Sequence, residues 1–585
     1  MKPTHQCNEL RLSDAGKEVI LAGWVQKRRD HGGLIFVDLR DRSGIIQIVF
    51  TEGNPNHKIA HEIRNEYVLA ICGKVSKRPE GTENPNLDTG QIEIIAESLE
   101  ILNRSETPPF VIDDSAQDVS EETRLKYRYL DLRRPAMQNN LKLRHKIYMA
   151  TRNFLDKKGF MEVETPILTK STPEGARDFL VPSRLMPGSF FALPQSPQLF
   201  KQLLMISGIG KYFQIAKCYR DEDLRADRQL EFTQIDIEMS FIDEEDIFKL
   251  TEGLMFQIFR ESLGISLEIP FRRMTYAESM RRYGSDKPDV RFGMELIDVG
   301  DIVADSDFKV FASTVGSGGQ VKGIVAKGLA KASRKEIDDL TEYVKGFGAK
   351  GLVSFKILDG DVESPVKKFF SQTHIEKLRD RMNATAGDLV LLVADKPGIV
   401  AESLNRLRLR LGNELGMIDD KKFEFLWIID FPLFHYNEDE KRIDSEHHPF
   451  TGVHPDDMPL LDTDPLKVRS RSYDLVLNGN ELASGSIRIH NQDLQEKIFQ
   501  ILQLKQEEIE GRFGFFLEAL KYGAPPHGGI APGLDRLVAV MVGSKSIRDV
   551  IAFPKTQSGT CMVTGAPASV SENQLKELFI RSVIE

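Results

Sequence analysis

Cysteine is scarce in this 585-residue sequence, and the few cysteines lie far apart. They are Cys7, Cys72, Cys218 and Cys561, so no CxxC spacing occurs. Structural zinc sites and disulfide frameworks both need cysteines at short, repeated spacings. The sequence therefore argues against a structural zinc site and favours a reducing compartment, and we expect a cytoplasmic protein.

Long hydrophobic runs are absent as well. No apolar stretch approaches the roughly 18 residues that a membrane span needs, and the first 17 residues, MKPTHQCNELRLSDAGK, lack the apolar core of a signal peptide. With 28% charged and 41% hydrophobic residues, we expect a soluble globular protein without a membrane partner. The chain is longer than a single hydrophobic core can stabilise, so three or four domains are expected.

Several catalytic motifs are also missing. The sequence has no Walker A loop, no HExxH and no Ser/His/Asp triad with supporting sequence. Its net charge is −10, so a nucleic-acid partner would have to be held by a local basic surface.

Two alternating stretches between residues 212 and 241 predict a pair of strands joined by a charged loop. In Tyr212–Arg220, one face carries Phe213, Ile215 and Tyr219, and the other carries Gln214, Ala216, Cys218 and Arg220. In the second strand, one face carries Thr233, Ile235, Ile237 and Met239, and the other carries Phe232, Gln234, Asp236 and Glu238. A polar row beside an arginine suits the floor of a binding site, although an ordinary half-exposed hairpin has the same pattern.

The N-terminal segment reads as a small β-barrel. Five strand-like runs surround a short helical stretch, Lys58–Asn65: Val19–Gln26, Leu34–Leu39, Ile45–Phe50, Tyr67–Val75 and Ile92–Ile101. This order is typical of an OB-fold, which often binds single-stranded nucleic acid. The cluster Lys27-Arg28-Arg29 is expected to end the first strand, near Phe36 and Gln47. A solvated charge run beside a core phenylalanine remains the alternative.

The middle of the chain alternates between helix, strand and loop signals. A polar linker spans 103–122, a helical pattern covers Glu121–Gly159, and a strand follows at Phe160–Pro166. Residues 171–177 have the composition of a mobile lid. Ser196 can cap a helix whose first position is Pro197. Gly-rich αβ-like units between Pro270 and Lys421 indicate an inserted domain of about 130 residues.

The C-terminal part returns to strands. Asn478-Gly479 predicts a two-residue hairpin turn, which places Val476 opposite Glu481 and Asp474 opposite Ala483. Asp474 and Glu481 then share a face and could hold Mg²⁺, unless they are ordinary surface acids. A bulge within 483–486 would bring Arg488 to the same face. Finally, small residues from Gly528 precede an apolar helix whose first turn carries Arg536, a position that suits a bound anion.

Together these segments resemble the class II aminoacyl-tRNA synthetases, specifically the bacterial-type aspartyl enzymes, over nearly the whole chain. Phe160–Pro166 and the preceding helix look like motif 1, Phe213–Phe241 like motif 2, and Gly528–Val542 like motif 3, with QSPQLFKQ, HHPF and GSIRIH between them. The resemblance implies an α+β multidomain fold with an OB-fold barrel, an antiparallel-sheet catalytic domain and an inserted α/β domain. The expected segments are 1–105 (barrel), 106–140 (hinge), 141–285 and 421–585 (catalytic), and 286–420 (insert).

The resemblance also implies the reaction. Aspartate would attack ATP to give aspartyl-adenylate and pyrophosphate, and tRNA would then accept the aspartyl group, in a homodimer using Mg²⁺. Arg220 and Arg536 would be catalytic, and Asp474 and Glu481 would bind the metal. ATP would contact Arg220, Asp221, Glu222, Gln229, Phe232, Glu481, Gly533, Leu534, Asp535 and Arg536. Aspartate would contact Glu174, Ser196, Gln198, Lys201, Arg220, Gln234, Asp236, His447 and Arg488.

Anticodon contacts are implied for Arg28, His31, Phe36, Gln47, Gly81 and Glu93. His31 and Gly81 look like the relaxed members that charge both tRNA(Asp) and tRNA(Asn); a strictly tRNA(Asp)-specific enzyme is the alternative. More distant alternatives are an asparagine or lysine synthetase, a non-catalytic tRNA-binding paralogue, and an OB-fold protein fused to an unrelated enzyme.

Overall fold

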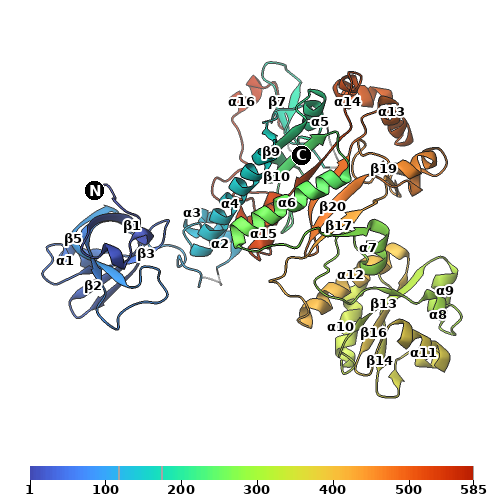
Figure 1. Ribbon diagram of the computed structural model, residues 1–585, viewed down its shortest axis with the longest axis horizontal. Helices are drawn as coiled ribbons and strands as arrows, with labels where there is room; N and C mark the ends of the chain where they lie inside the picture. The colour runs from blue at the N-terminus through green and yellow to red at the C-terminus, as the bar shows by residue number, and fades with distance from the viewer. Residues whose placement is uncertain (116–118, 173–175, 584–585) are drawn as a thin grey trace. The chain divides into compact units, whose positions relative to one another are not determined.

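The computed structural model describes residues 1–115, 119–172 and 176–583, and within these no helix is long and apolar enough to cross a membrane. The chain divides into two compact units. One comprises residues 1–142 and 548–568, and the other comprises 143–547 and 569–585. Figure 1 shows the elements of each. None of the four cysteines, all of which are described, forms a disulfide.

The first unit contains a closed five-stranded barrel in the order β1-β2-β3-β5-β4. The strands are β1 (Glu18–His31), β2 (Leu34–Arg40), β3 (Ile45–Phe50), β4 (Val68–Lys77) and β5 (Ile92–Asn103), with α1 (His57–Glu62) after the third. Alternate side chains such as Val19, Leu21, Ile46 and Ile48 fill its core. The OB-fold prediction is therefore confirmed.

The sequence predicted that the basic cluster of the barrel ends the first strand, and this prediction is wrong. Lys27, Arg28 and Arg29 lie inside β1, which continues to His31 after a register shift between Val25 and Lys27. The hairpin then turns through Gly32 and Gly33, both at positive φ. A two-residue turn of this kind needs positive φ at both positions, which glycine adopts without steric cost. The cluster is thus held on paired, rigid backbone.

The rest of the first unit is helical and forms around a buried arginine. The single helix expected from Glu121 to Gly159 is in fact three: α2 (Glu121–Lys126), α3 (Arg128–Asp131) and α4 (Pro135–Lys157). Arg128 donates to the carbonyls of Arg548, Ile551 and Ala552 and pairs with Asp131. It thereby holds the short helix η6 (Ile547–Val550) and the two residues that follow it.

The second unit is built on an eight-stranded sheet in the order β11-β17-β20-β21-β22-β10-β9-β6. The strands are β6 (Met161–Glu162), β9 (Lys211–Tyr219), β10 (Glu231–Ser240), β11 (Arg272–Thr275), β17 (Phe425–Ile429), β20 (Ser472–Leu477), β21 (Asn480–Ile487) and β22 (His527–Pro532). The pairs from β17 to β9 are antiparallel, whereas β11 and β6 join the two edges in parallel. The predicted motif 2 hairpin, β9–β10, lies inside this sheet.

Two sequence expectations need correction here. Only Met161 and Glu162 of the strand expected at Phe160–Pro166 pair with β9. The small residues after Gly528 form the interior strand β22, which the sequence pattern did not indicate because glycines seldom favour strands. They are small because neighbouring strands approach closely: a Cβ on Gly529 would lie 1.9 Å from Glu238 Oε2.

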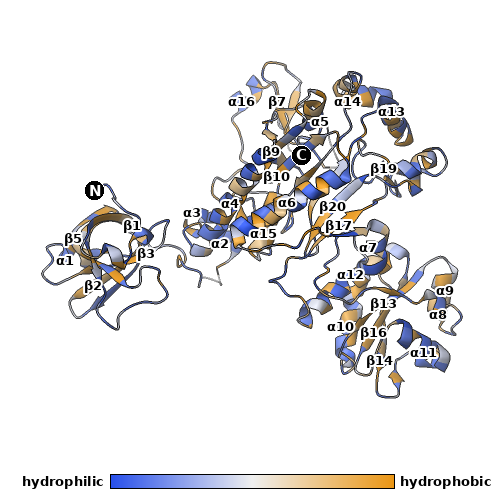
Figure 2. Ribbon diagram, in the orientation of Figure 1, coloured by the Kyte–Doolittle hydropathy of each residue, from blue (hydrophilic) through white to orange (hydrophobic). Residues whose placement is uncertain are grey.

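Helix α6 (Glu244–Leu263) runs along the sheet (Figure 1) and buries one stripe of its surface, including Ile247, Leu254 and Ile258. Figure 2 shows hydrophobic and hydrophilic residues alternating along it, as the spacing of a half-buried helix requires. From behind the sheet, Glu252 accepts hydrogen bonds from the indole of Trp427 and from Phe271 N. The opposite face of the sheet is left for the polar side chains described below.

The insert has its own five-stranded sheet, ordered β12-β13-β16-β14-β15. It contains β12 (Ile297–Asp298), β13 (Gln320–Ala326), β14 (Val353–Ile357), β15 (Val362–Glu363) and β16 (Leu389–Asp395), with α8 (Gly300–Val303), α9 (Lys309–Gly316), α10 (Arg334–Lys345), α11 (Gln372–Arg381) and α12 (Pro397–Glu414). The helix and strand content is mixed as expected. All its strand pairs are antiparallel, however, so this sheet is not of the parallel α/β type.

Smaller elements complete the second unit. They are α5 (Gln198–Ile206), α7 (Tyr276–Tyr283), α13 (Gln492–Ile501), α14 (Gln506–Leu520), α15 (Leu534–Met541), α16 (Glu572–Glu577), and the two-stranded sheets β7 (Leu180–Pro182) with β8 (Phe190–Ala192) and β18 (Phe434–Asn437) with β19 (Arg442–Ser445). Helix α5 begins at Gln198 with Pro197 as its N-cap, so the prediction that Ser196 caps the helix and Pro197 takes its first position is wrong by one residue. Ser196 Oγ nevertheless accepts from Gln198 N at 3.3 Å.

Candidate functional site

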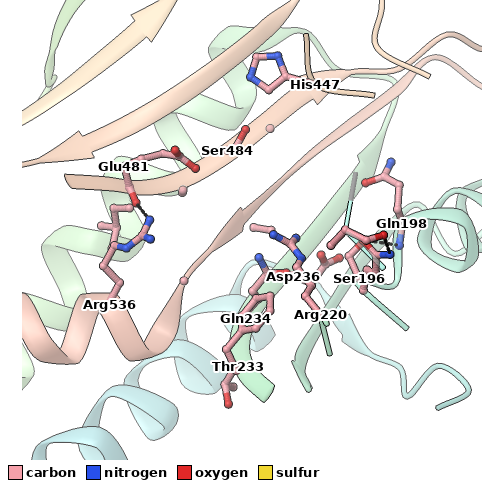
Figure 3. Close-up of a pocket in the computed structure, with 18 of the residues that line it drawn as sticks. Ser196, Gln198, Arg220, Thr233, Gln234, Asp236, His447, Glu481, Ser484 and Arg536 are labelled. Carbon is pink, nitrogen blue, oxygen red and sulfur yellow. Dashed lines mark hydrogen bonds between the residues drawn. The ribbon is translucent and has the colours of Figure 1, made fainter. Parts of the chain in front are cut away.

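A cavity of about 470 Å³ opens on the polar face of the large sheet. Its walls come from the loop between β9 and β10, from β10, β21 and β22, from the starts of α5 and α15, and from the loop at 446–448. In Figure 3, Glu481 and Arg536 lie at one end and Ser196 and Gln198 at the other. This volume falls within the range of ligand sites, and the walls carry charges of both signs.

Four fully buried charged side chains form one network at the floor of the cavity. Lys201 Nζ lies 3.1 Å from Asp236 Oδ2 and 3.3 Å from Glu238 Oε2. Arg488 donates from Nε to Glu238 Oε1 at 3.0 Å and from Nη2 to Glu238 Oε2 at 3.2 Å. Each of the four is at most 4% exposed. Since a buried charge is tolerated only when it is paired, these two cations and two anions hold one another in place.

The electrostatics of the two carboxyls differ. Burial raises the pKa of Asp236 to about 6, with Lys201 opposing the rise. Burial also acts on Glu238, but Arg488 and Lys201 outweigh it and lower the pKa of that carboxyl. Glu238 is therefore the firmly ionised partner of both cations, whereas Asp236 changes its charge near neutral pH. The sequence pattern placed Glu238 on the polar row without giving it a role.

Arg488 reaches the cavity because of an irregularity in β21. Val476 pairs with Glu481 as predicted, but Asp474 pairs with Ser484 rather than Ala483. Leu482 is the extra residue, so the bulge lies before the predicted 483–486 segment. An extra residue shifts the alternation by one, which puts Glu481, Ser484, Ser486 and Arg488 on the cavity side. Ser486 Oγ then accepts from Arg488 Nη1 at 2.7 Å.

His448 is a second neighbour of Arg488 that the sequence did not single out. Its Nε2 lies 2.8 Å from Arg488 Nη1, and its Nδ1 lies 3.1 Å from Phe450 N. Burial, followed by the charge of Arg488, lowers the pKa of His448 well below its ordinary value. A neutral ring leaves the positive charge of Arg488 undiminished. Its neighbour His447 lines the cavity directly, and burial lowers its pKa too.

Several buried polar atoms around the cavity have no hydrogen-bond partner among the described residues. They are Gln198 Nε2, Arg220 Nε, Asp236 Oδ1, His447 Nδ1 and Asp474 Oδ1. Buried polar groups in proteins are nearly always satisfied, so a cluster of exceptions needs an explanation. A polar ligand that carries both donors and acceptors would satisfy them.

The cavity is also lined by an aromatic ring and by two further arginines, Arg220 and Arg536. The guanidinium of Arg220 stacks 5.0 Å from the centroid of Phe232. Arg536, in the first turn of α15, donates to the carbonyl of Glu481 and lies 3.4 Å from Asp227 Oδ2. The arrangement offers a flat apolar surface flanked by cations, which suits a purine base and its phosphates.

Asp535 is a positioning residue within this arrangement. Its Oδ2 accepts from Thr233 N at 2.7 Å, and its Oδ1 accepts from Arg144 Nη1 at 2.5 Å. Arg144 also donates to Thr233 Oγ1 at 3.1 Å. The carboxylate thus ties α15 to β10 and α4. Asp535 lines the cavity as predicted, but both of its carboxylate oxygens accept hydrogen bonds from protein groups.

Asp474 and Glu481, the two predicted metal ligands, lie close enough to act on each other electrostatically. Glu481 lines the cavity, while Asp474, which pairs with Ser484 across β20 and β21, does not line it and is 4% exposed. Burial and the nearby Glu481 raise the pKa of Asp474 well above its ordinary value. Among residues 1–115, 119–172 and 176–583, no three His, Cys, Asp or Glu side chains form a metal-holding group. The unpartnered Asp474 Oδ1 fits a cation that takes its remaining ligands from a phosphate or water.

Most predicted site residues gather at this one cavity. Those lining it are Ser196, Gln198, Lys201, Arg220, Glu222, Gln229, Phe232, Gln234, Asp236, His447, Glu481, Gly533, Asp535, Arg536 and Arg488. Asp221, Leu534 and Asp474 are not among its lining residues, and Glu174 lies outside the described residues. Lining residues that the sequence did not indicate include Gln195, Asp227, Arg228, His448, Ser484 and Ser486.

The barrel carries a separate polar surface. Gln47 donates to Glu93 at 2.9 Å, and Arg29 donates to both Gln47 and Asp38. His31 and Phe36 lie beside it, with ring centroids 6.3 Å apart. Arg29 Nε and Arg78 Nη2 are buried without partners among the described residues. Of these, Asp38 and Arg78 were not anticipated from the sequence.

Arg28 and Gly81 flank this surface. Arg28 is held by Ala60 O at 3.2 Å, by Asp30 at 3.2 Å and by His61 at 3.1 Å. Gly81 is exposed at φ 81° and donates its N–H to Glu83. Cations, an aromatic ring and amide groups on one barrel face are typical of single-stranded nucleic-acid binding.

The fold is that of the tRNA synthetases. Solved structures of asparaginyl-tRNA synthetase from Pyrococcus horikoshii, complexed with asparaginyl-adenylate, and of aspartyl tRNA synthetase from Entamoeba histolytica are 20% and 19% identical to this chain. Their TM-scores are 0.60 and 0.57; they cover 94% of this chain in each case, and the matches span 98% and 91% of those chains.

The sequence defines the family more narrowly. The family model "tRNA synthetases class II (D, K and N)" matches residues 120–557, and "OB-fold nucleic acid binding domain" matches 19–102. The chain belongs to the class II tRNA synthetases of this group. The enzymes named Aspartate--tRNA(Asp/Asn) ligase from Thermoanaerobacter sp. (strain X514) and Natranaerobius thermophilus are 57% and 58% identical to it, over 99% and 100% of this chain and 98% and 100% of theirs.

Proposed function

We propose that this protein attaches L-aspartate to tRNA(Asp) and also to tRNA(Asn), in two ATP-dependent steps. In the first, the α-carboxylate of aspartate attacks the α-phosphorus of ATP, giving aspartyl-adenylate and releasing pyrophosphate. In the second, the terminal hydroxyl of the tRNA attacks the mixed anhydride and releases AMP. The observation that carries the proposal is the buried Lys201–Glu238–Arg488 network at the floor of the cavity.

This reaction requires no protein nucleophile. It brings two anions together, so the main tasks are to position them and to neutralise charge. Arg220, with its unpartnered Nε and its stack on Phe232, bridges the attacking carboxylate and the α-phosphate. Phe232 supports the adenine from below and Arg536 covers it, reaching toward the γ-phosphate. Glu222 and Gln229 contact the nucleotide.

Mg²⁺ would be held by Asp474 and Glu481 together with phosphate oxygens. When bound it supplies positive charge to the polyphosphate and so favours departure of pyrophosphate. The protein's part is to present two carboxylates whose mutual repulsion a cation relieves, consistent with the raised pKa of Asp474.

Selection of aspartate over asparagine is a problem of charge. The two are nearly isosteric, but the carboxylate of aspartate is attracted by the charges of Arg488 and Lys201, whereas the neutral amide of asparagine gains no such attraction. Gln198 and Asp236 would bind the amino group, since Asp236 Oδ1 is an unused buried acceptor. Ser196, Gln234 and His447 complete the pocket, and Glu174 is expected to join them.

The anticodon would bind the polar face of the barrel. Phe36 would stack on one base, while Gln47 and Glu93 would hydrogen-bond others beside Arg28. His31 and Gly81 favour acceptance of both tRNAs, which differ at the third anticodon base. A relaxed enzyme implies a downstream amidotransferase that converts the aspartyl group on tRNA(Asn) to asparaginyl.

Aminoacylation of the two purified tRNAs tests the proposal. We expect aspartate to be attached to both, and asparagine and lysine to support no pyrophosphate–ATP exchange. Charging of tRNA(Asp) alone would establish the strictly specific alternative. Exchange that depends on asparagine or lysine would overturn the choice of amino acid, and no exchange with any amino acid would indicate a non-catalytic relative.

We further propose a cytoplasmic homodimer. The four free cysteines fit a reducing compartment. An exposed apolar surface, formed by Ile167, Leu168, Leu180, Phe190 and Phe191, surrounds the β7–β8 pair, because residue 169 pairs with Ala192. Such a surface fits a second copy of the chain.

We also propose that the chain has five segments: a barrel (1–105), a hinge (106–140), a catalytic domain in two parts (141–285 and 421–585) and an insert (286–420).

A further inference from the structure

The segment that leads into the insert reaches the proposed metal carboxylates. Lys287 Nζ lies 3.8 Å from Glu481 Oε2 and 3.1 Å from Asp286 Oδ2. Asp286 and Lys287 also act electrostatically on the buried Asp474, in opposite directions. Neither residue lines the cavity, and the proposed function gives neither of them a role.

This segment is held firmly on both sides. Ser285 accepts from Lys287 N at 3.1 Å, and the carbonyl of Ser285 accepts from Ser279 Oγ of α7 at 2.6 Å. Gly284 passes so close to α12 that a Cβ there would lie 2.5 Å from Ala401 O. Asp289 lies against the turn of the β20–β21 hairpin, 3.1 Å from where a Cβ on Gly479 would be. Lys287 is therefore presented to Glu481 by fixed backbone.

We propose that Lys287, oriented by Asp286, is a positioning residue that occupies the cation's place at Glu481 until the metal–nucleotide complex binds. The inference rests on the proposed function, because it takes Asp474 and Glu481 as the metal carboxylates. The independent observation is Asp474 Oδ1, which is buried and has no hydrogen-bond partner among the described residues. Its carboxyl lies close enough to Glu481, Asp286 and Lys287 for all three to act on it electrostatically.

The charges account for this role. Asp474 and Glu481 repel each other when no cation is present, and Lys287 partly neutralises them from a half-exposed position, 45% accessible. A divalent ion brings more charge at shorter range, so it displaces the ammonium group from Glu481. Asp286 then retains Lys287 at 3.1 Å, which keeps the displaced charge away from the metal.

Two variants with opposite expected effects test the inference. In Lys287→Met no cation has to be displaced, so the apparent Kd for Mn²⁺ should fall by about three- to tenfold. In Asp286→Asn the lysine loses its alternative partner and the site loses a negative charge, so the same Kd should rise by a similar factor. A residue with a merely structural role would weaken Mn²⁺ binding in both variants.

The measurement is Mn²⁺ binding, followed by electron paramagnetic resonance, to the full-length protein with a non-hydrolysable ATP analogue. Lys287→Arg should behave as the wild type. Lys421→Met removes an exposed lysine elsewhere and should leave the Kd unchanged. Because the Lys287–Glu481 pair is half exposed, raising the salt concentration should reduce the difference between Lys287→Met and wild type.

The outcomes separate the two proposals. Unchanged or weaker Mn²⁺ binding in Lys287→Met, with nucleotide-dependent binding retained in the wild type, overturns the inference alone. If the wild type binds no Mn²⁺ with the nucleotide analogue, or if Glu481→Gln binds it as well as the wild type does, the metal site itself is wrong and both proposals fall.

Discussion

At the scale of single residues, the candidate site depends on how its buried acidic and basic side chains are paired. Glu238 pairs with both Lys201 and Arg488, so the two cations are fixed before any ligand arrives. Sequence alternation put Glu238 on the polar row of β10, but it could not show that its partner lies 250 residues further along the chain. Arg488 and Glu238 can pair because β21 and β10 lie on either side of β22 in the sheet.

Arg488→Leu should abolish aspartate-dependent pyrophosphate–ATP exchange, by at least about a thousandfold in kcat/KM, while the protein still folds. The reason is loss of the cation that recognises the side-chain carboxylate; Lys201 still neutralises Glu238 within the fold. Steady-state exchange assays and circular dichroism would check both parts. Arg442→Leu, which removes a surface arginine paired with Glu440 and Asp444, is the matched control. Exchange at the normal rate in Arg488→Leu would refute the assignment.

Aspartate binding should weaken as the pH falls through about 6. Asp236 has its pKa raised to about 6, mainly by burial, so its negative charge is lost below that pH and the amino group of aspartate loses a partner. Calorimetric titration of aspartate without ATP, between pH 5 and 8, measures this directly. Below pH 6 we expect the Kd to rise by roughly tenfold for each pH unit.

Asp236→Asn should bind aspartate weakly at every pH in that range, with a flat profile. A wild-type profile that is itself flat would contradict the role of Asp236. The same shift has a consequence for folding. Because the folded-state pKa lies above the ordinary value of 3.8, this carboxyl contributes stability fully below that value and loses the contribution as the pH rises toward 6.

At the scale of elements, β22 allows the charged network to exist. Glycines at 528 and 529 let β21 and β10 approach from both sides, and the side chain of Glu238 occupies the space that a Cβ at position 529 would need. The helix α15 that follows is secured by Asp535 to Thr233 and Arg144. Strand β22 and the first turn of α15 thus position Arg488 and Arg536.

Gly529→Ala should therefore destabilise the protein by about 1–3 kcal/mol, because its Cβ would overlap with Glu238 and the Ile237 carbonyl. It should also weaken aspartate binding, since Glu238 has to move. Thermal unfolding and aspartate titration are the measurements. Gly533→Ala is the matched control: a Cβ there has its nearest neighbour at 3.6 Å, so the fold should tolerate it. Equal stability of the two variants would contradict this account.

At the scale of the whole molecule, the two compact units carry different tasks in the proposed reaction. The barrel presents a surface for bases, and the large sheet presents a cavity for a nucleotide and a small acid. The barrel matches the OB-fold nucleic acid binding model over 19–102, and residues 120–557 match the class II tRNA synthetase model. The segment that enters the insert carries Lys287, whose Nζ lies 3.8 Å from Glu481 Oε2 of the large-sheet domain.

The exposed apolar surface around β7 and β8 gives a prediction at this scale. If it packs against a second copy, replacing Ile167 and Phe190 together by aspartate should convert the dimer to a monomer, because buried charges would be left unpaired. Light scattering after size exclusion measures the mass. Val310→Asp, at an equally exposed apolar residue of the insert, is the control and should leave the dimer intact. A wild-type monomer would contradict the proposed homodimer.

The sequence by itself determined the local elements of the protein. These are a barrel of five strands, a polar hairpin at 212–241, an Asn-Gly turn and an arginine at the start of the last motif helix. These are local properties, because periodicity and turn chemistry depend on residues a few positions apart. It also provided the family resemblance, which rests on three short motifs in order.

Tertiary structure alone decided how those parts face one another. The bulge at Leu482 depends on the register of the β20–β21 hairpin. Contacts between segments tens to hundreds of residues apart determine the strand at 527–532, the antiparallel pairing of the insert and the partners of Glu238, Asp535 and Lys287. Local patterns contain no information about such pairings, since strand order and close backbone approach are set by packing of the whole domain.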